Sequence, residues 1–335
     1  MAKQRDRRRR RRLIRTLVTL SALLFVILLP LAAAGLYYNS VLNRLSFVRG
    51  QTEVYPTPDA DSASYFEEAV PDTDDVSQQE YSPSSEIPKI VSVNKAEGEI
   101  YKGKNVINIL LIGSDYRIPH TSDPGRADVT MLCSLNKKTG SIKLVSFERG
   151  IMLDVPGVGQ DLLTHSFHWG GAELTTNLLR EYFLVDIAGY AHVDFDSFSA
   201  VVDAVGGVDI TLTNAEANRL KLPTGLNHLD GANALRYCRL RSIDSNWQRI
   251  ARQRTTVQAI LNRVKNMSVR ELDQLSQKVL PLIHTDLSKG EITSILMNAT
   301  KFFGVTAEQM TIPDHNNQYC DFQYEADRLH DFLYN

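Results

Sequence analysis

The sequence has few of the residues that build disulfide or zinc frameworks. Its 335 residues include three cysteines, Cys133, Cys238 and Cys320, which is an odd number without metal-site spacing. A single bridge from Cys320 to Cys133 or to Cys238 remains open, and buried free thiols are the simpler interpretation. A disulfide-rich scaffold is not indicated.

The signatures of several common enzyme classes are also absent. The chain has no glycine-rich phosphate loop followed by a lysine, and no Gly-x-Ser-x-Gly sequence. These absences argue against a P-loop NTPase and against a hydrolase whose serine lies on a nucleophile elbow. No internal repeat is found, and the formal net charge of −2 is close to neutral. Local patterns therefore have to indicate the function.

The N-terminus has the pattern of a membrane anchor. An arginine run, Arg7–Arg12, precedes an uncharged and mainly apolar segment from Leu17 to Tyr38. We predict a cytoplasmic basic segment at residues 1–16 and a transmembrane helix at 17–38, a signal anchor that leaves the rest of the chain outside the cell membrane. The alternative is a cleaved signal peptide, because Ala32–Gly35 offers small residues.

The segment after the apolar run is acidic and rich in serine and proline. From Gln51 to about Lys95 the composition has too little hydrophobicity to bury itself. We predict an extracellular acidic stalk or linker at residues 39–100.

Arginines are concentrated between Arg236 and Arg254. This stretch holds six arginines, no lysine and one acid, Asp244. Because the guanidinium fork matches phosphate oxygens in pairs, the choice of arginine favours recognition of phosphate or carboxylate. The alternatives are a basic helix packed over acids elsewhere and a nucleic-acid-binding stripe, and the predicted outward topology argues against nucleic acid.

Two aspartates lie at the ends of predicted neighbouring strands. Residues 105–112 form an apolar run that ends in Gly113-Ser114-Asp115, and Asp128 opens a second predicted strand that continues to Leu135. Carboxylates are suitable ligands for a magnesium ion that also contacts phosphate, although aspartates at strand ends are more often turn formers.

The remaining pattern alternates strands and helices, which indicates an α/β layered core. Asp196 is predicted to cap a helix that ends at Gly206-Gly207, and Asp230 to cap another. We predict further strands at 142–147, near 190–193, at 208–212 and near 310–312, and helices at 172–183, from 246 to before 267, at 269–283, at 288–303 and at 321–333.

The order of several motifs resembles the LytR-CpsA-Psr family. The similarity covers roughly residues 105–265 and continues to about Ile312. The motifs are Gly113-Ser114-Asp115, Arg126-x-Asp128, Arg149 after a strand, Asp203-Ala-Val-Gly206-Gly207-Val208, His228-Leu-Asp-Gly231, Tyr237-x-Arg239-x-Arg241 and Arg249-x-x-Arg252-Gln253.

The resemblance implies a three-layer α/β/α sandwich around a mixed sheet, here at residues 101–312, followed by a tail at 313–335 whose role it leaves open. It implies an extracellular phosphotransferase that moves a glycan phosphate from a polyprenyl-pyrophosphate carrier to peptidoglycan. Asp115 and Asp128 would hold Mg²⁺ or Mn²⁺. The pyrophosphate would be bound by Arg149, Arg239, Arg241, Arg249, Arg252 and Gln253, with Arg117 and Arg126 nearby.

Two positions depart from the family pattern. Gly150 follows Arg149 where the family usually has an acid, and Asn246 stands where it usually has an aspartate that is a candidate base. Asp244 is the nearby candidate for that role. The departures leave two other functions open, a polyprenyl-pyrophosphate hydrolase and a non-catalytic protein that binds polyprenyl phosphate or wall polymer.

Overall fold

The computed structural model describes residues 46–47, 93–115, 125–240, 243, 246–302, 304–314 and 320–335. The chain divides into two units, 1–45 and 46–335, and every described residue belongs to the second. Among the described helices, none is long and apolar enough to cross a bilayer. The predicted transmembrane helix at 17–38 lies outside the described residues and stays a prediction.

A seven-stranded mixed sheet forms the centre of the described unit, in the order β1-β10-β7-β2-β3-β4-β11. β2, β3 and β4 form the antiparallel meander predicted from the apolar runs, while β7 and β11 join it in parallel on either side. The strands are β1 (Ser46–Phe47), β2 (Val106–Ser114), β3 (Ala127–Asn136), β4 (Ile142–Phe147), β7 (Gly189–Asp194), β10 (His284–Thr285) and β11 (Glu308–Ile312).

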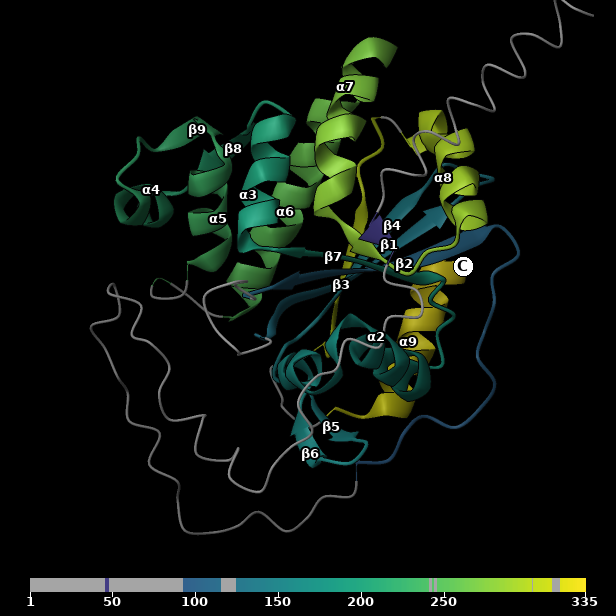
Figure 1. Cartoon of the computed structure of the whole chain (residues 1–335). Coiled ribbons are helices and arrows are strands. Elements are labelled where there is room, and N and C mark those ends of the chain that lie inside the picture. The colour runs from purple at the N-terminus through teal and green to yellow at the C-terminus, as the bar shows by residue number, and fades with distance from the viewer. Residues whose placement is uncertain are drawn as a thin grey trace, which may run out of the picture. The chain divides into compact units, whose positions relative to one another are not determined.

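One face of the sheet is covered by α2 (Leu163–Phe183) and α9 (Phe322–Tyr334) (Figure 1). Leu110 and Leu132 from the sheet pack in one buried cluster with Leu179 of α2 and Leu329 of α9, and none of these four side chains is exposed. The segment after residue 312 therefore completes the main core.

The opposite face is covered by α3 (Phe195–Ala204), α5 (Gly231–Arg239), α6 (Asn246–Val264) and α8 (Lys289–Phe302) (Figure 1). Met131 and Leu144 of the sheet pack with Val257 of α6 and Ile292 of α8. A separate cluster joins α3, α5 and α6 to the hairpin formed by β8 (Val208–Leu212) and β9 (Gly225–Leu229). Helices on both faces of a mixed sheet confirm the predicted α/β fold.

Smaller elements extend this arrangement, and the sequence predicted only some of them. They are the hairpin of β5 (Met152–Val155) with β6 (Gly159–Leu162), the hairpin of β8 (Val208–Leu212) with β9 (Gly225–Leu229), α4 (Asn214–Leu220), α7 (Val269–Val279) and the 3₁₀ turn η2 (Leu280–Leu282).

Several helix boundaries differ from the prediction. α2 begins at Leu163 rather than near Ala172, and it continues through a kink where Gly171 has φ 60° and ψ −158°. Only glycine adopts such a conformation without strain. The N-cap of α3 is Asp194 rather than Asp196, because the side chain of Asp194 accepts a hydrogen bond from Ser197 N at 2.7 Å.

The folded part of the chain begins before residue 101. Ala96 is buried in the main cluster, and Ser46 and Phe47, inside the segment predicted as a stalk, pair in parallel with His284 and Thr285. All three cysteines are free thiols, so neither of the two bridges left open by the sequence is present.

Candidate functional site

Asp115 and Asp128 lie at the same edge of the sheet. Because β2 and β3 are antiparallel, the end of β2 lies beside the start of β3. Asp115 accepts a hydrogen bond from Arg126 N at 2.5 Å through its Oδ1, and its own N–H donates to Arg126 O at 3.1 Å. This double contact holds the carboxylate of Asp115 next to the strand that carries Asp128.

Arg149 forms an ion pair with Asp128. It follows β4, and its Nη1 lies 2.5 Å from Asp128 Oδ1, with the two side chains 25% and 15% exposed. Thr164 N donates to Arg149 O at 3.0 Å, and Glu148 N donates to Ile312 O at 2.8 Å. The first turn of α2 and the end of β11 therefore fix the backbone that presents Arg149.

One face of helix α6 is polar near its N-terminal end and apolar farther along. Arg249, Gln253, Val257 and Ile260 recur at intervals of four, four and three residues, which places them on one face. From α5, Arg239 is added: its guanidinium carbon lies 4.5 Å from the centre of the Phe195 ring, a cation–π contact.

These residues line one cavity of about 230 Å³ between the sheet and α3, α5 and α6. Its polar lining comes from Asp128, Asp194, Arg239, Arg249 and Gln253. The rest is apolar, and includes Leu111, Met131, Phe198, Val257, Ile260 and Ile283. Along both β3 and α6 the polar residues come first and the apolar ones follow, so charged side chains border one end of a cavity whose wall is almost entirely apolar.

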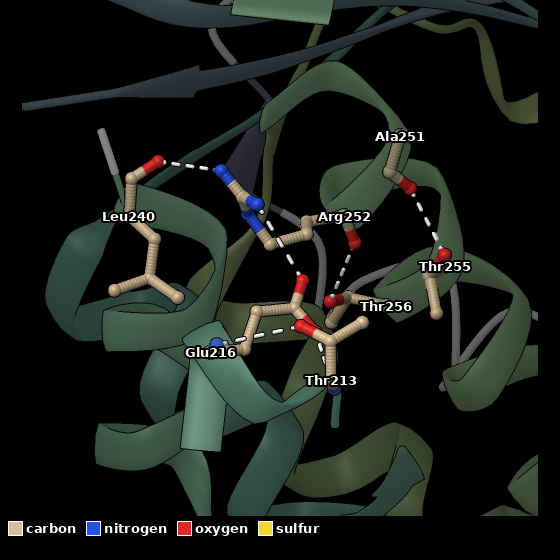
Figure 2. A network of polar contacts seen from close by, with 7 residues as sticks. All are labelled: Thr213, Glu216, Leu240, Ala251, Arg252, Thr255 and Thr256. Atoms are coloured by element: carbon tan, nitrogen blue, oxygen red, sulfur yellow. Dashed lines mark hydrogen bonds and ion pairs between the residues drawn. The ribbon is translucent and has the colours of Figure 1, made fainter. Parts of the chain in front are cut away.

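Arg252 lies outside the lining, unlike its neighbours Arg249 and Gln253. Figure 2 shows its guanidinium group directed toward Glu216 and the carbonyl of Leu240. Arg252 is 3% exposed; its Nη1 lies 3.4 Å from Glu216 Oε1, and its Nη2 donates to Leu240 O at 2.7 Å. Glu216 also completes the capping box of α4 with Thr213. Arg252 therefore contacts internal partners in this structure, and its role as a pyrophosphate ligand stays a prediction.

The remaining arginines of the cluster have different surroundings. Arg254 donates to Thr311 Oγ1 at 2.6 Å and to Met310 O at 3.1 Å, which joins α6 to β11. Arg236 is exposed and donates to Asn233. Arg117, Arg241 and Asp244 lie outside the described residues, as does the side chain of Asn246.

Sequence reasoning missed part of the cavity wall. Phe195 and Phe198 form its aromatic side, and Asp194 lines it while capping α3. The sequence could have indicated Phe198, because this residue belongs to the predicted apolar face of that helix. It could not have indicated Phe195, because the contact of Phe195 with Arg239 joins residues that are 44 positions apart.

The carboxylates at the strand ends fit a magnesium ion that is shared with a phosphate ligand. Within the described residues, no group of three or more His, Cys, Asp or Glu side chains is arranged to hold a metal. Mg²⁺ is usually held by one or two carboxylates, with water and substrate phosphates as the other ligands. Asp115 and Asp128 supply that number of hard oxygen donors.

Comparison with known proteins finds the same fold and family. The LytR_cpsA_psr family matches residues 66–335. The chain is 32% identical to the polyisoprenyl-teichoic acid–peptidoglycan teichoic acid transferase TagU of Oceanobacillus iheyensis over 61% of this chain, a match that spans 66% of the relative, just under two thirds of its length.

Two further matches agree with this one. The transferase TagT of Bacillus subtilis is 28% identical over 65% of this chain and 71% of its own. A solved structure of TagT bound to LIIa-WTA has a TM-score of 0.57 at 24% identity, covering 72% of this chain and 96% of that one, which shows a shared fold. With its matched region extending over most of its length, the chain belongs to the LytR-CpsA-Psr family.

Proposed function

We propose that this protein transfers a glycan phosphate from a polyprenyl-pyrophosphate carrier to peptidoglycan and releases polyprenyl phosphate. The proposal rests on one observation, an apolar cavity that is bordered at one end by charged side chains. A polyprenyl pyrophosphate has the same two-part character, a diphosphate with about two negative charges attached to a long apolar chain. The relatives that are named as teichoic acid transferases support the same reaction class.

Some of the described residues would bind the lipid-linked donor, and others would stabilise negative charge on the leaving phosphate. Arg239, Arg249 and Gln253 are positioned to bind the diphosphate oxygens, while Val257 and Ile260 contact the first isoprene units. Arg149, next to Asp128, stabilises the negative charge that develops on the leaving phosphate. A Mg²⁺ or Mn²⁺ ion at Asp115 and Asp128 would supply further charge neutralisation. Arg117, Arg126, Arg241 and Asp244 remain candidates from the family pattern.

The proposed location is the outer face of the cell membrane. The apolar segment 17–38 would anchor the chain as a single span with a cytoplasmic N-terminus, as the arginine run before it favours. Donor lipid and acceptor glycan would then both lie near the folded domain.

The test uses the full-length protein in detergent, with a polyprenyl-pyrophosphate-linked glycan, peptidoglycan fragments and Mg²⁺. We expect the release of polyprenyl phosphate and covalent attachment of the glycan phosphate to peptidoglycan. Asp115→Ala and Arg149→Ala should abolish both, and an undiminished double variant would exclude this site. His228→Ala serves as the control, because this side chain in the β8–β9 hairpin is 55% exposed.

Hydrolysis is the second candidate, and Asn246 favours it, because an amide cannot accept the proton of an acceptor hydroxyl. Product analysis separates the two reactions. Glycan phosphate that stays free in solution when the acceptor is present would indicate a hydrolase. A lipid that co-purifies without any turnover would indicate a binding protein.

A further inference from the structure

A short apolar turn joins helix α7 to strand β10. The turn, η2, consists of Leu280, Pro281 and Leu282, and none of the three side chains is buried. Ile283 follows it directly and belongs to the lining of the cavity. A continuous apolar stretch therefore runs from a partly exposed surface to the wall of the proposed donor site.

Ile283 lies on the other side of the cavity from the first charged residue of β3. It immediately precedes β10, whereas Asp128 belongs to β3, and the sheet order places β7 and β2 between these two strands. Since neighbouring strands are about 4.8 Å apart, the two residues are separated by about 14 Å across the sheet. A donor whose diphosphate lies near Asp128 would reach Ile283 with its lipid chain.

The cavity is too small for the whole of a long polyprenyl chain. Its volume is about 230 Å³. A cavity of about 150 Å³ is enough for one benzene ring, so this one would hold about two five-carbon isoprene units. The rest of the chain would have to leave through an apolar opening, and the stretch from Ile283 to η2 has that character.

Strand β1 connects the same surface to the predicted membrane anchor. It pairs with β10, which begins directly after Ile283, and it also lies against η2. The predicted transmembrane segment ends at Tyr38, eight positions before Ser46. These positions span at most about 29 Å even when fully extended. Because a folded unit of this length is about 45 Å across, β1 and η2 would lie on its membrane-facing side.

We infer that η2 forms the opening through which the polyprenyl chain passes between the cavity and the bilayer, with Leu280 and Leu282 in contact with membrane lipid. The inference rests on the proposed function and on the predicted membrane segment. Burial of leucine side chains in the apolar part of a bilayer is favourable. Lys278, which is exposed two positions before Leu280, lies where it would meet anionic head groups.

Two other apolar side chains are more exposed than Leu280 and Leu282. Leu226 in the β8–β9 hairpin is 75% exposed, and Met297 of α8 is 71% exposed. Neither is among the lining residues of the cavity, and the strand that pairs with β1 is β10. Leu226 and Met297 therefore serve as matched controls for membrane contact.

The first test measures contact with the bilayer directly. Full-length Leu282→Trp is reconstituted in liposomes of phosphatidylcholine and phosphatidylglycerol, with or without bromine on the acyl chains, and the tryptophan emission of wild type is subtracted. We expect bromine to quench at least about half of the added emission, because the side chain would lie among the acyl chains. Leu226→Trp and Met297→Trp should add emission that bromine leaves unchanged.

The second test separates entry of the lipid from the chemical step. The double variant Leu280→Asn, Leu282→Asn is assayed as full-length protein in liposomes, with peptidoglycan fragments as acceptor. One donor has a long chain embedded in the bilayer, and the other is water-soluble with about two isoprene units, the length that the cavity holds. We expect kcat/KM for the long-chain donor to fall by about tenfold, because contacts of leucine with lipid are lost. The value for the short-chain donor should stay within about twofold of wild type, which also shows that the variant is folded.

Each test has a result that would overturn the inference. Emission of Leu282→Trp that bromine leaves unchanged would place η2 outside the bilayer, and quenching of Leu226→Trp or Met297→Trp instead would assign the contact to another surface. Equal losses with both donors, or no loss with the long-chain donor, would exclude η2 as the path of the lipid. Wild-type protein that turns over neither donor would overturn the proposed function and with it the opening, whereas the quenching result would still decide whether η2 contacts the membrane.

Discussion

The two faces of the central sheet differ in how closely side chains pack against them. On the face covered by α2 and α9, apolar side chains such as Leu178 and Leu179 pack with almost no exposure. On the face covered by α3, α5 and α6, the same sheet borders a cavity of about 230 Å³. One face is closely packed, and the other gives up part of its packing to the cavity.

The difference shows that arginines close together in sequence need not act together. On the cavity side, Arg249 lines the cavity, whereas Arg252, three residues later, is directed toward Glu216. Variants on the two faces, and of the two kinds of arginine, should therefore affect different measurements.

The largest effect is expected for Arg252→Ala. It should lower the free energy of unfolding by about 3–5 kcal/mol, because it removes the cation from the buried carboxylate of Glu216. Denaturant unfolding measures this, with Arg249→Ala as the control that should lose less stability and more donor binding. Weakened binding of the lipid-linked donor at unchanged stability in Arg252→Ala would contradict this expectation and support the prediction that Arg252 binds the pyrophosphate.

Arg149→Ala should affect the reaction rather than the fold. We expect kcat for transfer to fall by about 10²–10³-fold, because the variant lacks the guanidinium group that would stabilise the developing negative charge. Arg149→Lys should recover only part of the rate, since lysine lacks the planar fork. A loss of stability as large as that of Arg252→Ala would mean that the pair with Asp128 is mainly structural.

A pair of apolar truncations compares the two faces directly. Leu178→Ala on the closed face should cost about 3 kcal/mol of unfolding free energy, because it leaves a void in close packing. Ile260→Ala, which enlarges an existing cavity, should cost less than about 1.5 kcal/mol and weaken binding of a polyprenyl phosphate. Equal losses of stability would contradict the distinction between the faces.

The closed face should also make stability depend on pH. Burial, with a smaller contribution from the charge of His284, lowers the pKa of His192 from 6.5 to about 4. Because the unfolded chain binds this proton more readily, stability is complete above pH 6.5 and falls as the pH drops toward 4. At pH 5 the loss should be about 2 kcal/mol. Unfolding curves at several pH values measure it, and His192→Gln should flatten the dependence.

The sequence predicted those features that depend on local pattern. Short apolar runs and a glycine turn gave the β2–β4 meander, and the position of Asp115 and Asp128 at adjoining strand ends followed from it. The contact of Arg252 with Glu216 could not be predicted, because the two residues are 36 positions apart and α4 had no strong pattern. Periodicity placed Arg249, Arg252 and Gln253 near one another, but the direction of each side chain depends on tertiary packing.

The bond from Glu148 N to Ile312 O makes the backbone around Arg149 depend on a strand that lies far along the chain. Strand β11 runs beside β4 and supports the residue that precedes Arg149. A variant chain without β11 would carry Asp115, Asp128 and Arg149 and still lack the support of that loop.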